Sequence, residues 1–276
     1  MGFTSTRSYF CGGGSGSHQI RARRTMQANL SIVIICKNEA DNIERAISSA
    51  RGLVRDIVVY DSGSTDDTIA IVEAMGIPVH RGPWLGFGPT RRAATMLAKN
   101  DWVFCLDADE ALSEALVDEL GAFRPEAGNA WQVQLRNHLG KRYIRWGVWR
   151  NDFRLRLFHR HECNWNDDLI HEKVVPLQPV HIHRLKGSVE HRTAKNIRDY
   201  RGKMENYARL TAEMYFRKGK RAGLLKLLFS PMLTFLKSYF GKMGFLEGLC
   251  GLELSMATAA YTAKKYAHLK LLRKGS

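Results

Sequence analysis

The alternation of short apolar runs with helical patterns between Leu30 and Asp107 constrains the fold of this chain most strongly. The apolar runs lie at 30–36 (LSIVIIC), 56–61 (DIVVYD), 77–80 (IPVH) and 101–107 (DWVFCLD). Strands and helices that alternate at this spacing form parallel strands with right-handed crossovers, and runs that are apolar at every position indicate a sheet covered on both faces. We therefore predict an α/β fold with a Rossmann-like, mostly parallel sheet.

The pattern changes after Ala130. The runs 131–137 (WQVQLRN) and 153–160 (FRLRLFHR) place apolar residues at every second position, which is typical of antiparallel or edge strands. From Asn196 the periodicity is helical to the end, whereas the start of the chain is rich in Gly, Ser and Arg. We predict a disordered N-terminal extension over 1–29, an α/β domain over 30–195 and a basic amphipathic helical region over 196–276.

The charge of the chain is divided between its parts. The net charge is +15, from 42 Lys and Arg against 27 Asp and Glu. Residues 30–130 carry 9 basic and 16 acidic side chains, whereas residues 195–276 carry 17 basic and 5 acidic ones. A basic tail on an acidic domain indicates that the two parts meet different partners, and a membrane surface or a polyanion fits the tail.

Two features of the sequence bear on where the protein works. In the apolar segment 222–261 the longest uncharged stretches, 227–236 and 254–263, have ten residues each. A membrane span needs about twenty, so we predict a helix at the interface or in the core instead. The five cysteines are scattered and show no CxxC spacing, which predicts reduced thiols in a cytosolic protein.

Polar side chains follow three of the predicted strands, at the edge where parallel α/β sheets bind their ligands. They are Asn38 and Glu39 after the first strand, Asp61 and Gly63 after the second, and Asp107 and Asp109 after the last. Two carboxylates one residue apart can both reach a hard cation, and Mg²⁺ prefers a few carboxylates together with phosphate oxygens. We predict that Asp107 and Asp109 hold Mg²⁺ or Mn²⁺; the alternative is that they only cap the next helix.

Asp61 lies where a nucleobase can bind. Its carboxylate can accept a hydrogen bond from a pyrimidine N–H, and the small residues after it let a ring approach the backbone. The alternative is an Asx-turn that leads into the next helix. Other motifs are absent or weak: no GxGxxG or P-loop occurs, and no Cys or carboxylate completes a zinc set with His181, His183 and His191.

Three ordered motifs, LSIVIICKNEADNI, VVYDSGSTDDT and GFGPTRRAATMLAKNDWVFCLDADE, resemble those of the family-2 glycosyltransferases, an inverting group with the GT-A fold. The resemblance covers about residues 30–195. Within the family, the W-x-GFG loop and DDLIHEKV are similar to the lipopolysaccharide-core β-glycosyltransferases that act on an inner-core heptose. The resemblance implies a metal at Asp107 and Asp109, and contacts to a UDP-sugar from Asn38, Glu39, Asp61, Gly63, Arg91 and Asp107.

An inverting transfer needs one general base that takes the proton of the acceptor hydroxyl. The resemblance implies an acidic pair well after the D-x-D motif, but this sequence has His171 and Glu172 there. We predict Glu172 as the base, with Asp168 as the second candidate. The alternative is that His171 and Glu172 form a structural pair that holds a loop against the Arg-rich strands.

These observations predict a metal-dependent hexosyltransferase that moves a hexose from a UDP-sugar, with inversion, to a lipid-linked acceptor such as lipopolysaccharide core. We expect it in the cytoplasm, bound peripherally to the anionic inner face of the cytoplasmic membrane. Transfer to a polyprenyl phosphate or an exopolysaccharide is the alternative within this class. A basic nucleic-acid-binding protein is the rival from another class. However, the sequence has no RRM, KH or helix-turn-helix pattern, so we expect no nucleic-acid partner.

Overall fold

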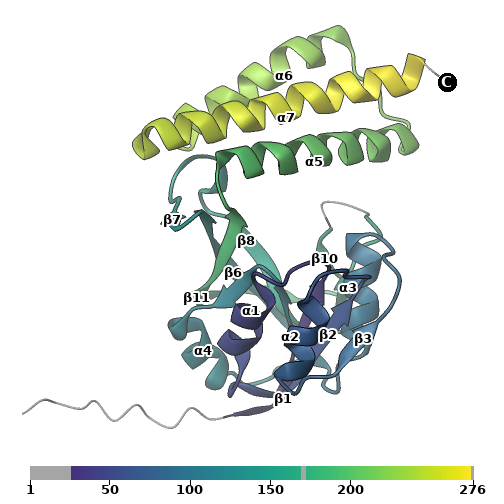
Figure 1. Cartoon of the computed structure of the whole chain (residues 1–276), viewed down its shortest axis with the longest axis vertical. Helices are drawn as coiled ribbons and strands as arrows, with labels where there is room; N and C mark the ends of the chain where they lie inside the picture. Colours follow the sequence, from purple (N-terminus) through teal and green to yellow (C-terminus); the bar gives the residue numbers. More distant parts are fainter. Residues whose placement is uncertain (1–25, 169–171, 275–276) are drawn as a thin grey trace, which may run out of the picture.

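The computed structural model of the chain describes residues 26–168 and 172–274. Most of the predicted extension over 1–29 therefore lies outside the described residues, and strand β1 (Gln27–Cys36) already begins at Gln27. An α/β unit occupies one end of the molecule and a layer of long helices the other (Figure 1).

The main sheet has the strand order β3-β2-β1-β4-β8-β6-β11-β5, with β7 paired to β6. Its strands after β1 are β2 (Val54–Asp61), β3 (Val79–Arg81), β4 (Trp102–Asp107), β5 (Glu110–Leu112), β6 (Asn129–Leu139), β7 (Arg142–Tyr143), β8 (Phe153–His159) and β11 (His181–Ala194). Strands β3, β2, β1 and β4 are parallel, as their continuous apolar runs predicted. Strand β8 is antiparallel to both β4 and β6, so the sheet as a whole is mixed.

Both faces of the parallel part of the sheet are covered by apolar clusters. Neighbouring side chains of a strand point to opposite faces, so each strand contributes to both clusters. Ile32 and Ile34 of β1 belong to one apolar cluster, which helices α1, α2 and α4 also enter. Val33 lies in a second cluster with Ala94 of helix α3. These helices are α1 (Ile43–Ala50), α2 (Thr68–Ala74), α3 (Phe87–Met96) and α4 (Glu114–Gly121). The central strands therefore form a rigid, buried support for the loops at their ends.

Two smaller groups of elements flank the main sheet. Strands β9 (Cys163–Trp165) and β10 (Val174–Pro176) form an antiparallel pair on either side of the loop that carries Asp168 and Glu172. Three short helical turns complete the described structure. The turn η1 (Gly147–Trp149) lies between β7 and β8, and η2 (Lys237–Gly241) and η3 (Gly244–Glu247) lie between the last two long helices of the chain.

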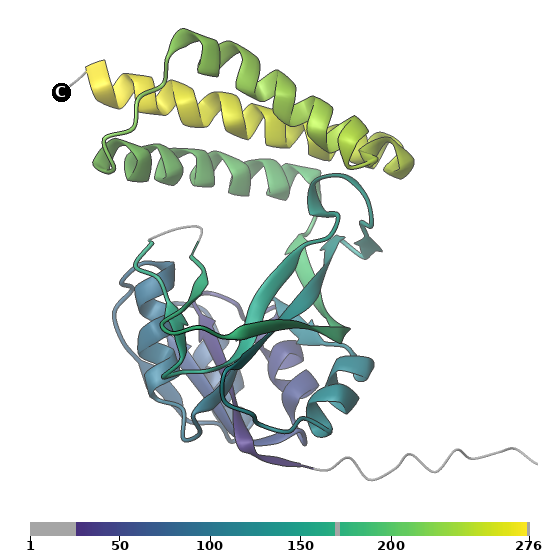
Figure 2. The same ribbon diagram turned by 180° about the vertical axis from the view of Figure 1, so that it is seen from behind.

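The helical layer consists of α5 (Ile197–Arg217), α6 (Leu224–Leu236) and α7 (Leu249–Lys274), and α7 packs against the other two (Figures 1 and 2). The buried carboxylate of Glu247 ties this layer to the sheet, since it accepts a hydrogen bond from Arg142 at 2.8 Å and from the backbone N–H of Arg145 at 2.9 Å. None of the helices that the structure describes is long and apolar enough to cross a membrane.

Candidate active site

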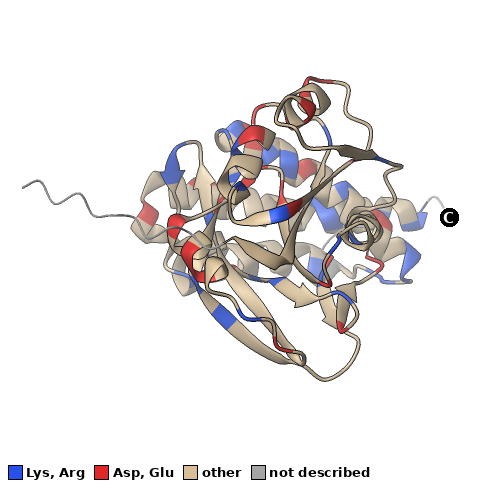
Figure 3. Cartoon of the chain, turned by 90° about the horizontal axis from the view of Figure 1, so that it is seen from below, with Lys and Arg blue, Asp and Glu red and all other residues tan. Residues whose placement is uncertain are grey.

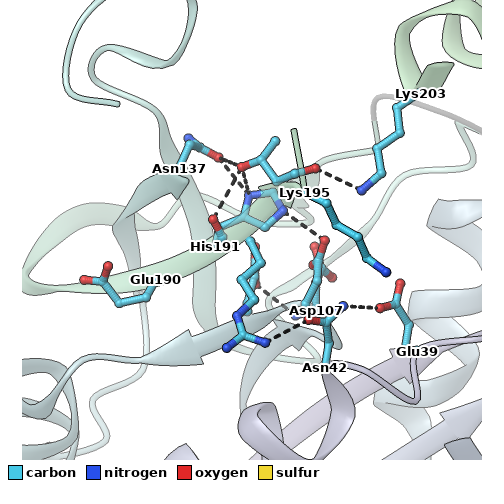
Figure 4. A network of polar contacts seen from close by, with 12 residues as sticks. Glu39, Asn42, Asp107, Asn137, Glu190, His191, Lys195 and Lys203 are labelled. Atoms are coloured by element: carbon cyan, nitrogen blue, oxygen red, sulfur yellow. Dashed lines mark hydrogen bonds and ion pairs between the residues drawn. The ribbon is translucent and has the colours of Figure 1, made fainter. Parts of the chain in front are cut away.

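The ends of β1, β2 and β4 lie side by side, because the register pairs Cys36 with Asp61 and Ile35 with Asp107. The predicted residues that follow these strands therefore meet at one edge of the sheet. The electrostatics of Glu39 reflect this. Burial raises the pKa of Glu39, and the negative charges of Asp109 and Asp107 raise it further, although Asn42 donates a hydrogen bond to the carboxylate (Figure 4).

Asp107, whose side chain is partly buried, forms the centre of the site. Its Oδ1 pairs with the guanidinium of Arg91, and its Oδ2 accepts a hydrogen bond from Arg156 at 3.0 Å. Arg156 also donates to Glu110 at 2.8 Å, and the Glu110 side chain is fully buried. Burial opposes ionisation of Asp107, but the two arginines outweigh it and hold its pKa well below the usual range. The ionised carboxylate of Asp107 is therefore shared between two buried cations, which also pair with Glu172 and Glu110.

We expect Asp107→Asn to lower the free energy of unfolding by about 3–5 kcal/mol, because it leaves two buried guanidinium groups with less compensating charge. Urea unfolding of the variant and the wild type measures the difference. Asp109→Asn is the matched control, since Asp109 has only His191 as its charged partner in the described structure, and it should cost about 1 kcal/mol. Equal losses of stability in the two variants would contradict the central role of Asp107.

Asp109 faces His191 of β11. The hydrogen bonds of the histidine, which Figure 4 shows beside Asn137, fix its orientation. His191 Nδ1 donates to Asn137 Oδ1 at 2.8 Å, and the same oxygen accepts from Thr193 Oγ1. This leaves Nε2 3.3 Å from Asp109 Oδ2. Burial disfavours the charged imidazole, but the charge and hydrogen bond of Asp109 outweigh it and raise the pKa of His191 to about 9.

Asp109 is the carboxylate of this edge that a divalent cation could reach, since Arg91 and Arg156 pair with Asp107 instead. His191 faces Asp109 as a protonated imidazole, and its Nε2 could join the ligands only after losing that proton. Among the described residues no group of three or more His, Cys, Asp or Glu side chains could hold a metal. The remaining ligands would therefore be water or phosphate oxygens. The structure engages Asp107 with arginines, so its role as a ligand stays a prediction.

Arg91 of α3 connects Glu172 to this centre. Its Nε donates to Glu172 Oε1 at 3.1 Å while its Nη1 pairs with Asp107, and the guanidinium lies over the ring of Trp165, 4.9 Å from the ring centroid. A buried guanidinium that is held on three sides has little freedom to move. The single side chain of Arg91 therefore bridges Glu172 and Asp107.

Asp168 is placed differently from Glu172. Its side chain pairs with Lys218 at the end of α5 and accepts a hydrogen bond from Asn166 at 2.9 Å. Its backbone carbonyl accepts from the N–H of Gly88 at 3.2 Å, and a Cβ at Gly88 would lie 2.0 Å from the Asn166 carbonyl oxygen. The glycine thus lets α3 contact the loop. The predicted partner of Glu172, His171, lies outside the described residues.

The residues predicted to bind the nucleotide form a compact double loop after β1 and β2. Buried Asp61 accepts hydrogen bonds from the backbone N–H groups of Gly63 and Ser64, both at 2.9 Å, which is the Asx-turn that we considered as the alternative. Burial opposes the ionisation of Asp61, but these bonds and that from the Ser64 hydroxyl lower its pKa. Asn38 accepts from the Thr65 N–H at 2.8 Å and joins the two loops.

Helix α5 also lies beside the site. Its Tyr207 is half-buried, and desolvation together with the charges of Asp109, Glu172 and Asp107 raises the pKa of the phenol to about 12. The phenol therefore stays protonated at neutral pH and can donate a hydrogen bond to an anionic neighbour. The region predicted as a basic C-terminal tail thus brings side chains to this edge of the sheet.

Lysines of the same helix reach the loops of the α/β unit. Lys203 donates to the backbone carbonyl of Thr193 at 2.9 Å, and its charge favours the ionised form of Glu39 (Figure 4). Lys218 pairs with Asp168. These contacts fix α5 across the ends of the strands.

Sequence reasoning gave no role in this site to several of its residues: Glu110, Arg156, His191 and Tyr207. Arg156 lies in the alternating run 153–160. The arginines of this run predict the solvated face of an edge strand. In the structure the side chain of Arg156 is buried against Asp107. His181 and His183 lie at the opposite end of β11 from His191, so the three histidines do not form one cluster.

Comparisons with known proteins agree on one family. Residues 31–172 match the model of glycosyl transferase family 2. The lipopolysaccharide core biosynthesis glycosyltransferase LpsC of Rhizobium meliloti (strain 1021) is 33% identical over 255 residues, which are 86% of this chain and 93% of that protein. An uncharacterized glycosyltransferase of Rickettsia felis is 30% identical over 263 residues, which are 87% of this chain and 89% of that protein.

A solved structure also aligns with part of the chain. It is glucosyl-3-phosphoglycerate synthase from Mycobacterium tuberculosis in complex with Mn²⁺, UDP and glucosyl-3-phosphoglycerate, with 27% identity, a TM-score of 0.33, and coverage of 40% of this chain and 44% of that one. The family match, which spans the strands from β1 to β9, confirms the predicted GT-A type of α/β fold. It also confirms the resemblance inferred from the motifs: this chain belongs to glycosyl transferase family 2.

Proposed function

We propose that this glycosyltransferase moves a hexose from a UDP-sugar, with inversion at the anomeric carbon, to a lipid-linked acceptor of the lipopolysaccharide core. One observation carries the proposal: the Asp109 and His191 pair lies beside Asp107, which Arg91 links to Glu172, at the ends of the parallel strands. The likeness to LpsC, which is named for lipopolysaccharide core biosynthesis, supports the class of acceptor.

The donor would lie across the ends of β1, β2 and β4. We assign the uridine to the loops of Asn38, Glu39, Asp61 and Gly63, where Gly63 has φ 101° and a Cβ there would meet no heavy atom within 4 Å. The diphosphate would then reach Arg91 and the Asp109 and His191 pair. A divalent cation held at Asp109 would supply positive charge for the leaving diphosphate.

Glu172 is our candidate for the general base. As the acceptor oxygen forms its bond to the anomeric carbon, the bond from that carbon to UDP breaks, and the acceptor proton passes to the carboxylate. The ion pair with Arg91 places Glu172 close to the assigned diphosphate site. Asp168 is the second candidate, and its pairing with Lys218 directs it towards α5.

A lipid-linked acceptor requires the enzyme to work at a membrane. We infer that it binds peripherally to the inner face of the cytoplasmic membrane, where cytoplasmic UDP-sugars are available. The basic composition of residues 195–276 supports attraction to anionic lipid.

Mass spectrometry of lipid-linked glycans from a deletion strain tests this function. We expect a lipopolysaccharide core that lacks one hexose and everything attached beyond it. The wild-type gene should restore the full core, whereas a gene encoding Asp109→Asn should not. An intact core together with a shortened polyprenyl-linked glycan or exopolysaccharide would instead support the alternative acceptors.

A further inference from the structure

Helix α6 carries a continuous apolar stripe that no part of the described chain covers. Its members recur at the three- and four-residue spacing of one helix face, and their side chains are between 41% and 72% exposed. They are Leu225, Leu228, Phe229, Met232, Leu233 and Leu236. The exposed side chains of Phe240, Phe245, Leu246 and Leu249 continue the apolar surface past the end of α6. We call these ten residues the α6 stripe.

The opposite face of α6 is packed against α7. Thr234 lies 3.3 Å from Thr262 of α7, measured between the hydroxyl oxygens, and just beyond α6 the hydroxyl of Ser238 lies 2.8 Å from that of Ser255. Helix α6 is apolar apart from Lys226, Ser230 and Thr234, and a helix this apolar is normally buried on most sides. Here the protein buries one side only, so the α6 stripe needs another apolar surface to cover it.

The charges around the α6 stripe are of one sign. Residues 214–246 contain seven Lys and Arg residues and no Asp or Glu. Lys226 and Lys237 lie within and directly after α6, and both are exposed. Figure 3, viewed from the side of the α/β unit, shows that Lys and Arg continue along the helices behind it. The surface that meets the stripe should therefore be apolar inside and anionic at its boundary.

We propose that the α6 stripe inserts into the interfacial region of an anionic lipid bilayer and so docks the enzyme on the membrane. This deepens the proposed function, on which it rests for the lipid-linked acceptor. The stripe side chains enter the boundary between headgroups and acyl chains, while the lysine side chains extend to the lipid phosphates. Helix α6 lies on the side of the helical layer away from the α/β unit (Figure 1), so the α/β unit stays in the cytoplasm.

A second copy of the chain fits this surface less well. A symmetric contact through the α6 stripe would bring the same basic residues of both copies together. With no acidic residue between 214 and 246, these charges would find no partners within the contact. Like charges that face each other across an interface disfavour association, whereas anionic headgroups would neutralise them.

Vesicle flotation of the full chain tests the proposal. We expect the wild type to float with vesicles of phosphatidylcholine and phosphatidylglycerol and to float much less with phosphatidylcholine alone. The double variant Phe229→Ser and Leu233→Ser should bind the mixed vesicles at least about tenfold more weakly. The matched control is Leu177→Ser with Ile182→Ser, which alters two exposed apolar residues of the α/β unit and should float like the wild type.

UDP binding by calorimetry is measured on every variant to show that it is folded. If the double variant does not fold, Leu225→Ser replaces it, since Leu225 is the most exposed member within α6. Undiminished flotation of a folded stripe variant would overturn the proposal. So would self-association that depends on the stripe without flotation of the wild type. Normal flotation with an intact core in the deletion strain would refute the proposed function and leave the docking surface standing.

Discussion

Replacing Asp109 by Asn should reduce sugar transfer at least about a thousandfold and abolish the Mn²⁺-dependent part of UDP binding. The amide keeps the size of the side chain but loses the negative charge that faces His191 Nε2. The backbone support of Asp109 stays, because its carbonyl accepts hydrogen bonds from Arg45 and from the N–H of Arg192. Calorimetric titration of UDP with and without Mn²⁺ measures the effect, and thermal unfolding shows whether the fold is kept.

His191→Gln should weaken Mn²⁺-dependent UDP binding in the same direction, because it removes the imidazole nitrogen that faces Asp109. Asp67→Asn serves as the control, since Asp67 is exposed near the nucleotide loops and makes no capping hydrogen bond to α2. Near wild-type turnover by Asp109→Asn would show that the metal assignment is wrong. If UDP binding lost its Mn²⁺ dependence in Asp107→Asn alone, at unchanged stability, Asp107 would be the metal ligand instead.

The central strands could be predicted from the sequence because a strand that is buried on both faces is apolar at nearly every position. Strand β4 is apolar at every position before Asp107, and its side chains enter the clusters on both faces of the sheet. No comparable sequence pattern predicts the order of the later strands in the sheet. Strand β11 lies between β6 and β5 through pairs that join residues about 50 and 80 positions apart, such as Glu190 with Arg136 and with Ala111. Local periodicity carries no information on such distant partners.

The site was predictable where it follows the ends of the parallel strands and not where later elements supply it. Asp61 and Asp109 end or follow apolar runs, so their shared edge follows from the sheet alone. His191 and Arg156 come from strands whose alternating patterns leave two interpretations, a solvated face or a face turned towards the site. The place of Tyr207 beside the carboxylates depends on how α5 packs, which helical periodicity does not specify.

Glu172→Gln should lower the turnover number by about 100-fold or more while UDP binding stays unchanged, on the scale usual for loss of a general base. The amide keeps an oxygen that can accept the hydrogen bond from Arg91 Nε, so the guanidinium should keep its place against Asp107. Transfer is measured with radiolabelled UDP-sugar and acceptor lipopolysaccharide extracted from the deletion strain. Asp168→Asn makes the same chemical change at the other candidate and should have a much smaller effect.

The pH profile separates a base from a residue that only positions Arg91. If Glu172 takes the proton, Glu172→Gln should lose the pH dependence that the wild-type turnover number owes to the general base. If Glu172 only orients Arg91, the variant should bind UDP more weakly and keep the wild-type pH profile at a reduced rate. Arg91→Lys distinguishes the two further, because a lysine keeps the positive charge but cannot contact Glu172 and Asp107 through separate nitrogens. A large loss in Asp168→Asn with little change in Glu172→Gln would exchange the roles of the two carboxylates.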